Sequence, residues 1–467
     1  MHSSSRSVVT TGLRIPNKRA MKNETEYIKL FEENRNLIDS PCAALLNAQR
    51  PAAFAKFAAQ GFPTIKDEAY RNSNVEKLFA TNYGINLGRI KMGDNPHEGF
   101  TCDVPNLATR QEFIVNDCYQ AEEGSRKSLP EGVLLGSLNA YARSHEALLA
   151  PYYNTLACNG DSIAQFNTAF VQDGMLLYIP RDTELAETIQ LVTLLRSNIE
   201  MMSNRRLLII LEEGAKANLL VCDHSSNEKA TLSTQITEVY LGNNASLNLF
   251  ELEETGYANN RLAHLFVQQK GGSTFNHSSI TLTGGFTRNG VYVSLDEEGA
   301  EANLSGLAIC DKQQHTDNHT LVEHKAGRCT SNELYKYILD EQSTGVFAGK
   351  MHIYPDAQHT ASQQTNRNLC LTSCAKMYAQ PQLEIYADDV KCSHGSTVGQ
   401  LDESALFYMQ QRGIPKDEAR HLLMFAFAGE VIENISIDAL RDRLHILVEK
   451  RFRGELNRCK GCALCKQ

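Results

Sequence analysis

The sequence predicts a mainly β protein in which a β-helix is flanked by N-terminal and C-terminal helical regions. Between residues 166 and 400, short strands and Gly/Asn turns recur about every 30 residues, and such units must stack on their neighbours to bury their apolar side chains. Before and after this stretch, apolar residues follow the three- and four-residue spacing of helices. A chain of 467 residues is long enough to enclose a large core in this way.

The N-terminal part divides into a leader and a mainly helical region. Residues 1–20 are rich in Ser and Thr, basic and free of acidic residues, which is typical of a transit peptide or of an upstream translation start. Residues 21–165 are predicted to be mainly helical. The elements expected there are helices over 24–37, 41–46, 52–59 and 138–149, a linker over 85–108 and a strand over 112–116.

The β-helix is predicted from a repeat within residues 166–400. In each copy a turn residue, a small residue and an apolar residue precede an asparagine. The asparagines are Asn218, Asn248, Asn276 and Asn303, at steps of 30, 28 and 27 residues. Leucine-rich repeats need a different motif, ankyrin and tetratricopeptide units are helical, and a propeller blade needs about 40 residues, so stacked β-helix coils fit best.

Residues 381–399 end the predicted β-helix as two short strands joined by a tight turn at 387–389. Cys392 and His394 are two residues apart, so an extended backbone places both side chains on one face. A thiol beside an imidazole can bind a soft metal or act as a nucleophile with its base. The structural alternative is a buried cysteine and an ordinary hydrogen-bonded histidine.

A C-terminal helical region is predicted over residues 401–452. Asp402 is a suitable N-cap, Pro415 begins a second helix, and the apolar spacing from Ile437 to Leu447 indicates a third. This unit is too small for a large core of its own. We therefore expect it to pack on the β-helix or a partner, or to cap the open end of the solenoid.

Residues 453–467 form a basic, Cys-rich tail. Cys459, Cys462 and Cys465 have the C-x-x-C-x-x-C spacing of metal ligands. Three thiolates need a fourth ligand, which a partner, a small thiol, a second tail or another cysteine of this chain can supply. Persulfide handling and an adventitious, disulfide-prone tail are the alternatives.

Composition narrows the class of protein. The formal charge of −9 gives no whole-chain footprint for nucleic acid, and no apolar run approaches the roughly 20 residues that span a bilayer. Thirteen mostly scattered cysteines indicate a reducing compartment, so we expect a cytoplasmic protein. No P-loop, G-x-S-x-G or H-E-x-x-H motif occurs. One further cluster could hold a metal, although ordinary core or surface roles are favoured: Cys310, His319, His324 and Cys329.

The stretch PQLEIYADDVKCSHGSTVG at 381–399, with ALFY at 405–408 and RGI at 412–414, closely resembles the SufB/SufD family. That family forms the scaffold of the Suf iron–sulfur cluster assembly machinery, and the form KCSHG-x-TVG is similar to its SufD branch. The resemblance is dense from Gly327 to Glu433 and traceable back to Phe62. It implies a right-handed parallel β-helix.

The resemblance also implies a function. The chain is expected to be a non-enzymatic scaffold that supports cluster formation and iron acquisition. It would pair with a SufB-like subunit near 381–399, with His394 and Cys392 facing that interface and a transient iron or iron–sulfur cluster there. Residues resembling the docking site of the SufC-like ATPase lie within 404–433 and are represented by Arg412, Gly413, Ile414 and Glu418. Reduced flavin in the assembled complex and a homodimer in isolation are further expectations.

Three alternatives stay open at this point. The chain could be a SufB-like subunit that itself holds the nascent cluster. It could be a β-helix carbohydrate-active enzyme, although the stretch 381–433 and the lack of a secretory signal argue against that class. It could also be a purely structural β-helix adaptor.

Overall fold

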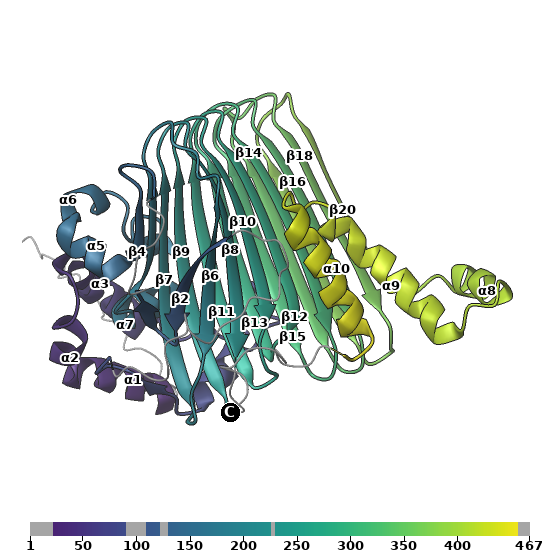
Figure 1. Cartoon of the computed structure of the whole chain (residues 1–467), viewed down its shortest axis with the longest axis horizontal. Coiled ribbons are helices and arrows are strands. Elements are labelled where there is room, and N and C mark those ends of the chain that lie inside the picture. Colours follow the sequence, from purple (N-terminus) through teal and green to yellow (C-terminus); the bar gives the residue numbers. More distant parts are fainter. Residues whose placement is uncertain (1–21, 90–108, 122–128, 226–228, 456–467) are drawn as a thin grey trace, which may run out of the picture.

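The computed structural model describes residues 22–89, 109–121, 129–225 and 229–455, and its centre is a solenoid of two facing sheets (Figure 1). Successive strands alternate between the sheets, so that each pair of strands with its corners makes one coil, in about seven turns. Neighbouring strands are parallel throughout, apart from the β2–β3 and β4–β5 pairs. The predicted parallel β-helix is therefore confirmed.

Each sheet has ten strands, and we name them sheet A and sheet B. Sheet A contains β1 (Gly84–Ile85), β4 (Leu134–Ser137), β5 (Gly174–Ile179), β7 (Met201–Leu211), β9 (Thr231–Leu241), β11 (Asn259–Gln269), β13 (Phe286–Leu295), β15 (His315–His324), β17 (Thr344–Ile353) and β19 (Lys376–Ile385). Sheet B contains β2 (Thr109–Val115), β3 (Cys118–Gln120), β6 (Thr188–Leu195), β8 (Lys216–Ser225), β10 (Ser246–Glu254), β12 (Thr274–Thr283), β14 (Glu301–Cys310), β16 (Thr330–Leu339), β18 (Ala361–Cys370) and β20 (Lys391–Gly399).

The repeated asparagines form a ladder on sheet B. Each amide nitrogen donates to the side-chain oxygen of the previous coil at 2.7 to 3.0 Å, and the ladder extends one coil beyond the four predicted members, to Asn332. The turn residue of the repeat needs a left-handed backbone: φ is +71° at Gly214, and Asn244 adopts the same conformation with φ +57°. Backbone geometry at the corner thus accounts for the Gly/Asn signal in the sequence.

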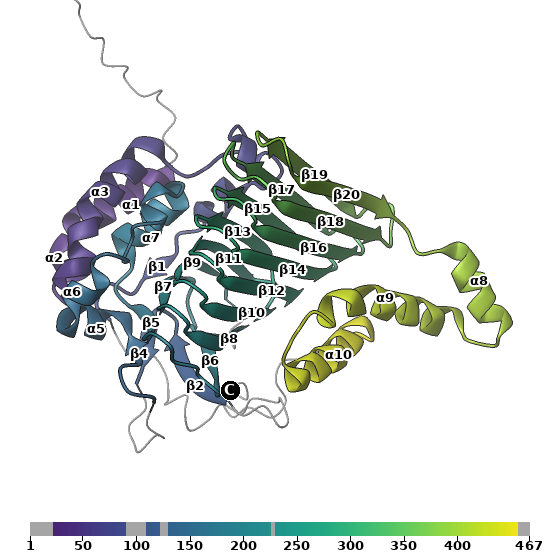
Figure 2. The same cartoon turned by 90° about the horizontal axis from the view of Figure 1, so that it is seen from above.

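The helical regions cover the outer faces of the two sheets. Apolar side chains between the sheets form the main core, whereas the N-terminal helices bury outward-facing residues of β7, β9 and β11 in sheet A (Figure 2). The N-terminal helices are α1 (Lys22–Glu33), α2 (Arg35–Asp39), α3 (Ala44–Gln60), η1 (Glu68–Tyr70), η2 (Val75–Ala80), α5 (Leu138–Ser144), α6 (Glu146–Leu149), η3 (Ala157–Asn159) and α7 (Ser162–Phe170).

The C-terminal helices are α8 (Glu403–Gln411), α9 (Lys416–Ile432) and α10 (Asp438–Phe452). Helices α9 and α10 pack against outward-facing apolar residues of sheet B, from Leu220 to Ile338, and α8 projects away from the solenoid (Figures 1 and 2). The alternative that this unit caps the open end is wrong, because its apolar face is buried on the flank of sheet B.

Four local predictions differ from the structure. The single helix expected over 24–37 is divided at Asn34 into α1 and α2. The two helices expected at 41–46 and 52–59 are one helix, α3, with Pro51 inside it; burial of Leu46 and Phe57 on the same side outweighs the hydrogen bond that the proline removes. The expected helix 138–149 is divided at His145 into α5 and α6. The strands of 381–399 lie in different sheets and are joined by a corner, not by a tight turn.

Candidate functional site

The solenoid ends in two edge strands that have a partner on one side only. β19 pairs with β17 and β20 pairs with β18, and within the described residues no strand continues either sheet beyond them. We call β19, β20 and the corner between them the open end. Unpaired edges of this kind are normally protected in monomers, because they can pair with another chain.

Cys392 and His394 lie on the same face of β20, as the spacing predicts. Cys392 is half-buried and packs against Ile353 and Ala357, whereas His394 is exposed. Burial raises the pKa of the Cys392 thiol. This face is the inner face of sheet B. Because β20 belongs to the last coil, the two side chains lie at the open end of the solenoid.

Beneath His394, the inner face of sheet B carries a buried polar column. His394 is in register with Gln364 of β18, which is in register with Glu333 of β16. The Gln364 amide donates to a Glu333 carboxylate oxygen at 2.6 Å, and the Thr320 hydroxyl reaches the same oxygen at 3.2 Å. Burial raises the pKa of Glu333 to about 7. Neither residue was predicted from the sequence, although the step of about 30 residues from His394 back to Gln364 and Glu333 was the available signal.

The open end also exposes apolar side chains. Tyr378, Ile385, Tyr386 and Val398 are 40, 41, 60 and 55% exposed. Large exposed apolar residues on unpaired edge strands indicate a surface that another protein covers. The two donors on β20 therefore lie within a surface suited to a partner.

The other four candidate ligands are not brought together. Cys310 and His324 are buried on the inner side of the solenoid, where the His324 ring bonds to Ser331, while His319 lies on the outer face of β15 beside Tyr292. Cys329 is buried and its thiol donates to the Glu297 carbonyl oxygen. No group of three or more His, Cys, Asp or Glu residues in the described part of the chain could hold a metal.

The second candidate surface is α8 with the start of α9. Phe407 and Tyr408 are 61 and 58% exposed, and the Arg412 guanidinium lies 5.2 Å from the centre of the Tyr408 ring. Gly413, with φ +86°, makes the turn between the helices. Ile414 is half-buried, and the Glu418 carboxylate accepts a hydrogen bond at 3.3 Å from Arg453, the residue that follows α10. Of the predicted partner-binding residues, Arg412 and Gly413 are thus exposed and Glu418 is partly engaged within the chain.

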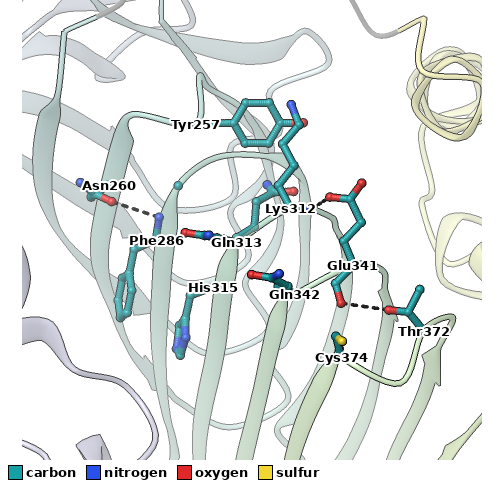
Figure 3. Close-up of a pocket in the computed structure, with 12 residues that line it drawn as sticks. Tyr257, Asn260, Phe286, Lys312, Gln313, His315, Glu341, Gln342, Thr372 and Cys374 are labelled. Atoms are coloured by element: carbon teal, nitrogen blue, oxygen red, sulfur yellow. Dashed lines mark hydrogen bonds between the residues drawn. The ribbon is translucent and has the colours of Figure 1, made fainter.

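The tail cysteines Cys459, Cys462 and Cys465, the leader and most of the 85–108 linker lie outside the described residues. The described chain ends beside a cleft of about 850 Å³ at one row of solenoid corners (Figure 3). Every cysteine in the described ranges is a free thiol, and Cys374 in this cleft is exposed.

Comparison with known proteins identifies the class. Residues 194–427 match the family described as "SUF system FeS cluster assembly, SufBD core domain", and residues 21–191 match the SufBD protein N-terminal region. The chain therefore belongs to the SufB/SufD family of the Suf iron–sulfur cluster assembly system. Within that family it is SufD-like: of three similar proteins, two are named SufD and one is named a SufBD family protein.

Two of these relatives are similar over most of the chain. An iron–sulfur cluster assembly SufBD family protein of Synechocystis is 27% identical over 417 residues, covering 87% of this chain and 91% of the relative. The iron–sulfur cluster assembly protein SufD of Bacillus subtilis is 23% identical over 447 residues, covering 92 and 98%. SufD of Escherichia coli is 32% identical over 245 residues, covering 52% of this chain and 58% of the relative. Among the described helices, none is long and apolar enough to cross a membrane.

Proposed function

We propose that this chain is a non-catalytic scaffold subunit of a cytoplasmic Suf assembly complex. It binds a SufB-like subunit at the open end and a SufC-like ATPase at α8 and the start of α9. The observation that carries the proposal is the open end itself, where two unpaired edge strands, exposed apolar residues and the Cys392/His394 pair occur together. A SufB-like partner with the same fold would supply matching edge strands.

Iron or the nascent cluster is cargo in this proposal. Cys392 and His394 offer one sulfur and one nitrogen donor, a set that suits iron and its clusters. Two donors do not complete a coordination shell, so the remaining ligands come from the facing subunit. A cluster held between subunits can be handed on when they separate. A reduced flavin, if the assembled complex uses one, would bind only after this assembly.

The ATPase surface is argued from exposure and shape. α8 carries exposed aromatic rings on a helix whose main contact within the described residues is with α9. Helix α9 is in turn anchored on sheet B, where the Lys336 ammonium bonds to the Glu430 carboxylate and, at 2.9 Å, to the Phe427 carbonyl oxygen. Movement of the ATPase at α8 would thus be transmitted through α9 to the flank of the solenoid.

The test is co-expression with SufB-like and SufC-like subunits followed by pull-down on a tag of this chain. Val398→Glu places a charge in the open end and should abolish capture of the SufB-like subunit while retaining the ATPase. Ile199→Glu is the matched control, because Ile199 is equally exposed, at 55%, but lies in the β6–β7 corner at the other end of the solenoid. Capture of the SufB-like subunit by Val398→Glu at the control level would refute the assignment. A homodimer of the isolated chain that only Val398→Glu dissolves would show that the same surface also binds a second copy.

A further inference from the structure

The two strands of the open end differ in the backbone groups that they leave free. In a parallel sheet, the amide and carbonyl groups of successive residues point alternately to the two neighbouring strands. An edge strand therefore bonds to its neighbour through every second residue and presents the others to a strand beyond it. Figure 2 shows β19 and β20 at the end of the stack, so the register of each strand decides which of its residues face the free edge.

In β19 the residue at the centre of the free edge is a proline. The amides of Lys376 and Tyr386 donate to backbone oxygens on the side of β17, at 2.9 and 3.0 Å. The pairing of β19 with β17 runs residue for residue through the strand. Pro381 lies an odd number of residues from both of these donors, so its backbone faces the free edge. Because proline has no amide hydrogen, the edge of sheet A lacks a donor at its middle.

In β20 the free edge is complete. The Lys391 amide donates to the Thr360 carbonyl oxygen at 2.8 Å, on the side of β18, and the pairing with β18 again runs residue for residue. The residues whose backbone faces the free edge are therefore Cys392, His394, Ser396 and Val398. None of them is a proline, so this edge presents an amide donor and a carbonyl acceptor at every position.

The two edges also differ in how they are protected. Monomeric proteins protect edge strands with prolines and charged side chains, because unpaired edges bind other chains. β19 has Pro381 and the charged residues Lys376 and Glu384, whereas residues 392–399 contain no Asp, Glu, Lys, Arg or Pro. Most residues of that stretch are Ser, Thr or Gly, whose small side chains let another strand approach. Only β20 is thus an unprotected edge.

We propose that the partner continues sheet B alone: one of its edge strands pairs with β20 through main-chain hydrogen bonds, while β19 meets the partner through side chains. This pairing rests on the proposed function, in which the SufB-like subunit occupies the open end. Exposed Tyr378, Ile385 and Tyr386 supply the side-chain contact at β19. A partner residue paired with His394 would present its own side chain on the inner face of sheet B, roughly 5 Å away between Cα atoms. Main-chain pairing thus brings ligands of the facing subunit beside Cys392 and His394.

The test is capture of the co-expressed SufB-like subunit by tagged variants of this chain. Ser396→Pro removes one amide from the free edge and no hydrogen bond between β18 and β20, so it should lower capture at least roughly tenfold while the circular dichroism spectrum is retained. Ser396→Ala is the matched control, because it removes the hydroxyl that donates to Asn366 at 3.1 Å but keeps the amide. Pro381→Ala should capture the subunit as the wild type does.

Equal capture by Ser396→Pro and Ser396→Ala would overturn the pairing through β20. If Val398→Glu still abolished capture in that case, the open end would remain the interface, so the pairing and the proposed function fail separately. Loss of a homodimer in Ser396→Pro, with capture of the SufB-like subunit intact, would assign the pairing to a second copy of this chain and would also overturn the proposal.

Residue-resolved amide hydrogen exchange of the wild-type proteins tests the pairing without a substitution. In the isolated chain, the amides of His394 and Ser396 should exchange faster than those of Ser393 and Gly395, which bond to β18. Binding of the SufB-like subunit should slow His394 and Ser396 to the rate of these neighbours, whereas Leu383, on the free edge of β19, should keep its faster exchange. Unchanged alternation in β20, or loss of the alternation in β19, would overturn the proposal.

Discussion

His394 combines exposure with a fixed position, since its strand is held on one side by β18 and its face is shared with the packed Cys392. We predict that His394→Ala leaves the complex assembled but lowers its iron and sulfide content severalfold, because alanine offers no nitrogen ligand. The measurement is iron and sulfide per complex after anaerobic co-purification. If Cys392 only packs against Ile353 and Ala357 and donates no sulfur to iron, Cys392→Ser should have the smaller effect. Wild-type content in His394→Ala would reduce this residue to a structural role.

Glu333 should make stability depend on pH. Its pKa is raised by burial to about 7, whereas an unfolded glutamate titrates near about 4.3. The folded chain therefore binds the extra proton between these values, so the free energy of unfolding falls by up to about 4 kcal/mol as pH rises through that window, and the loss is complete above it.

We predict that Glu333→Gln, which keeps an acceptor for Gln364 and Thr320, is more stable than the wild type at pH 8 and not at pH 5. Urea unfolding at both pH values measures the difference. The exposed Glu341→Gln is the control and should not change the pH dependence. The same slope in Glu333→Gln and wild type would contradict the prediction.

At the scale of elements, the C-terminal helices differ in which of their surfaces are buried and which are exposed. The inner faces of α9 and α10 are buried on sheet B, whereas α8 keeps its aromatic residues exposed. Because the unit packs on the flank and not on the mouth of the solenoid, the open end and α8 can both be occupied at once. In the proposed function, this arrangement would let one subunit bind two different partners.

We predict that Phe407→Glu abolishes co-purification of the SufC-like ATPase while the circular dichroism spectrum and capture of the SufB-like subunit stay unchanged. A charge on an exposed ring position costs the fold little but disrupts an apolar interface. Arg412→Glu should act in the same direction. Leu37→Glu is the control, because Leu37 lies on α2 and is also exposed, at 52%. Undiminished ATPase capture by both α8 variants would show that the ATPase binds elsewhere.

At the scale of the whole molecule, the solenoid is a stack in which each coil is stabilised by its neighbours. In the part of the chain that the structure describes, interior coils are paired on both sides, whereas the coil formed by β19 and β20 is paired on one side only. Local opening should therefore be easiest at the open end.

We predict that amide hydrogen exchange of the isolated chain is faster in β19 and β20 than in β11 and β12, and that the SufB-like subunit protects the open end selectively. Exchange in β7, at the end covered by the N-terminal helices, is the internal reference. Uniform protection of the strands in the free chain, or no change at β20 on binding, would count against the open end as the interface.

The sequence by itself was enough to predict the coil of the β-helix and the family of the protein. Turn residues with left-handed backbone, the spacing of Asn218, Asn248, Asn276 and Asn303, and the alternation around Cys392 and His394 are properties of one coil, so a short stretch of sequence contains them. The C-terminal helices were likewise predictable from their caps and apolar spacing.

Only the tertiary structure decided what those coils bring together. The stacking register places Glu333 and Gln364 beneath His394, separates Cys310 from His319, and sets Arg451 of α10 beside Gln314. It also directs the C-terminal helices to sheet B, so that these helices do not cover the open end of the solenoid. These relations depend on burial summed over many coils and on contacts between residues more than a hundred positions apart, which no local pattern in the chain encodes.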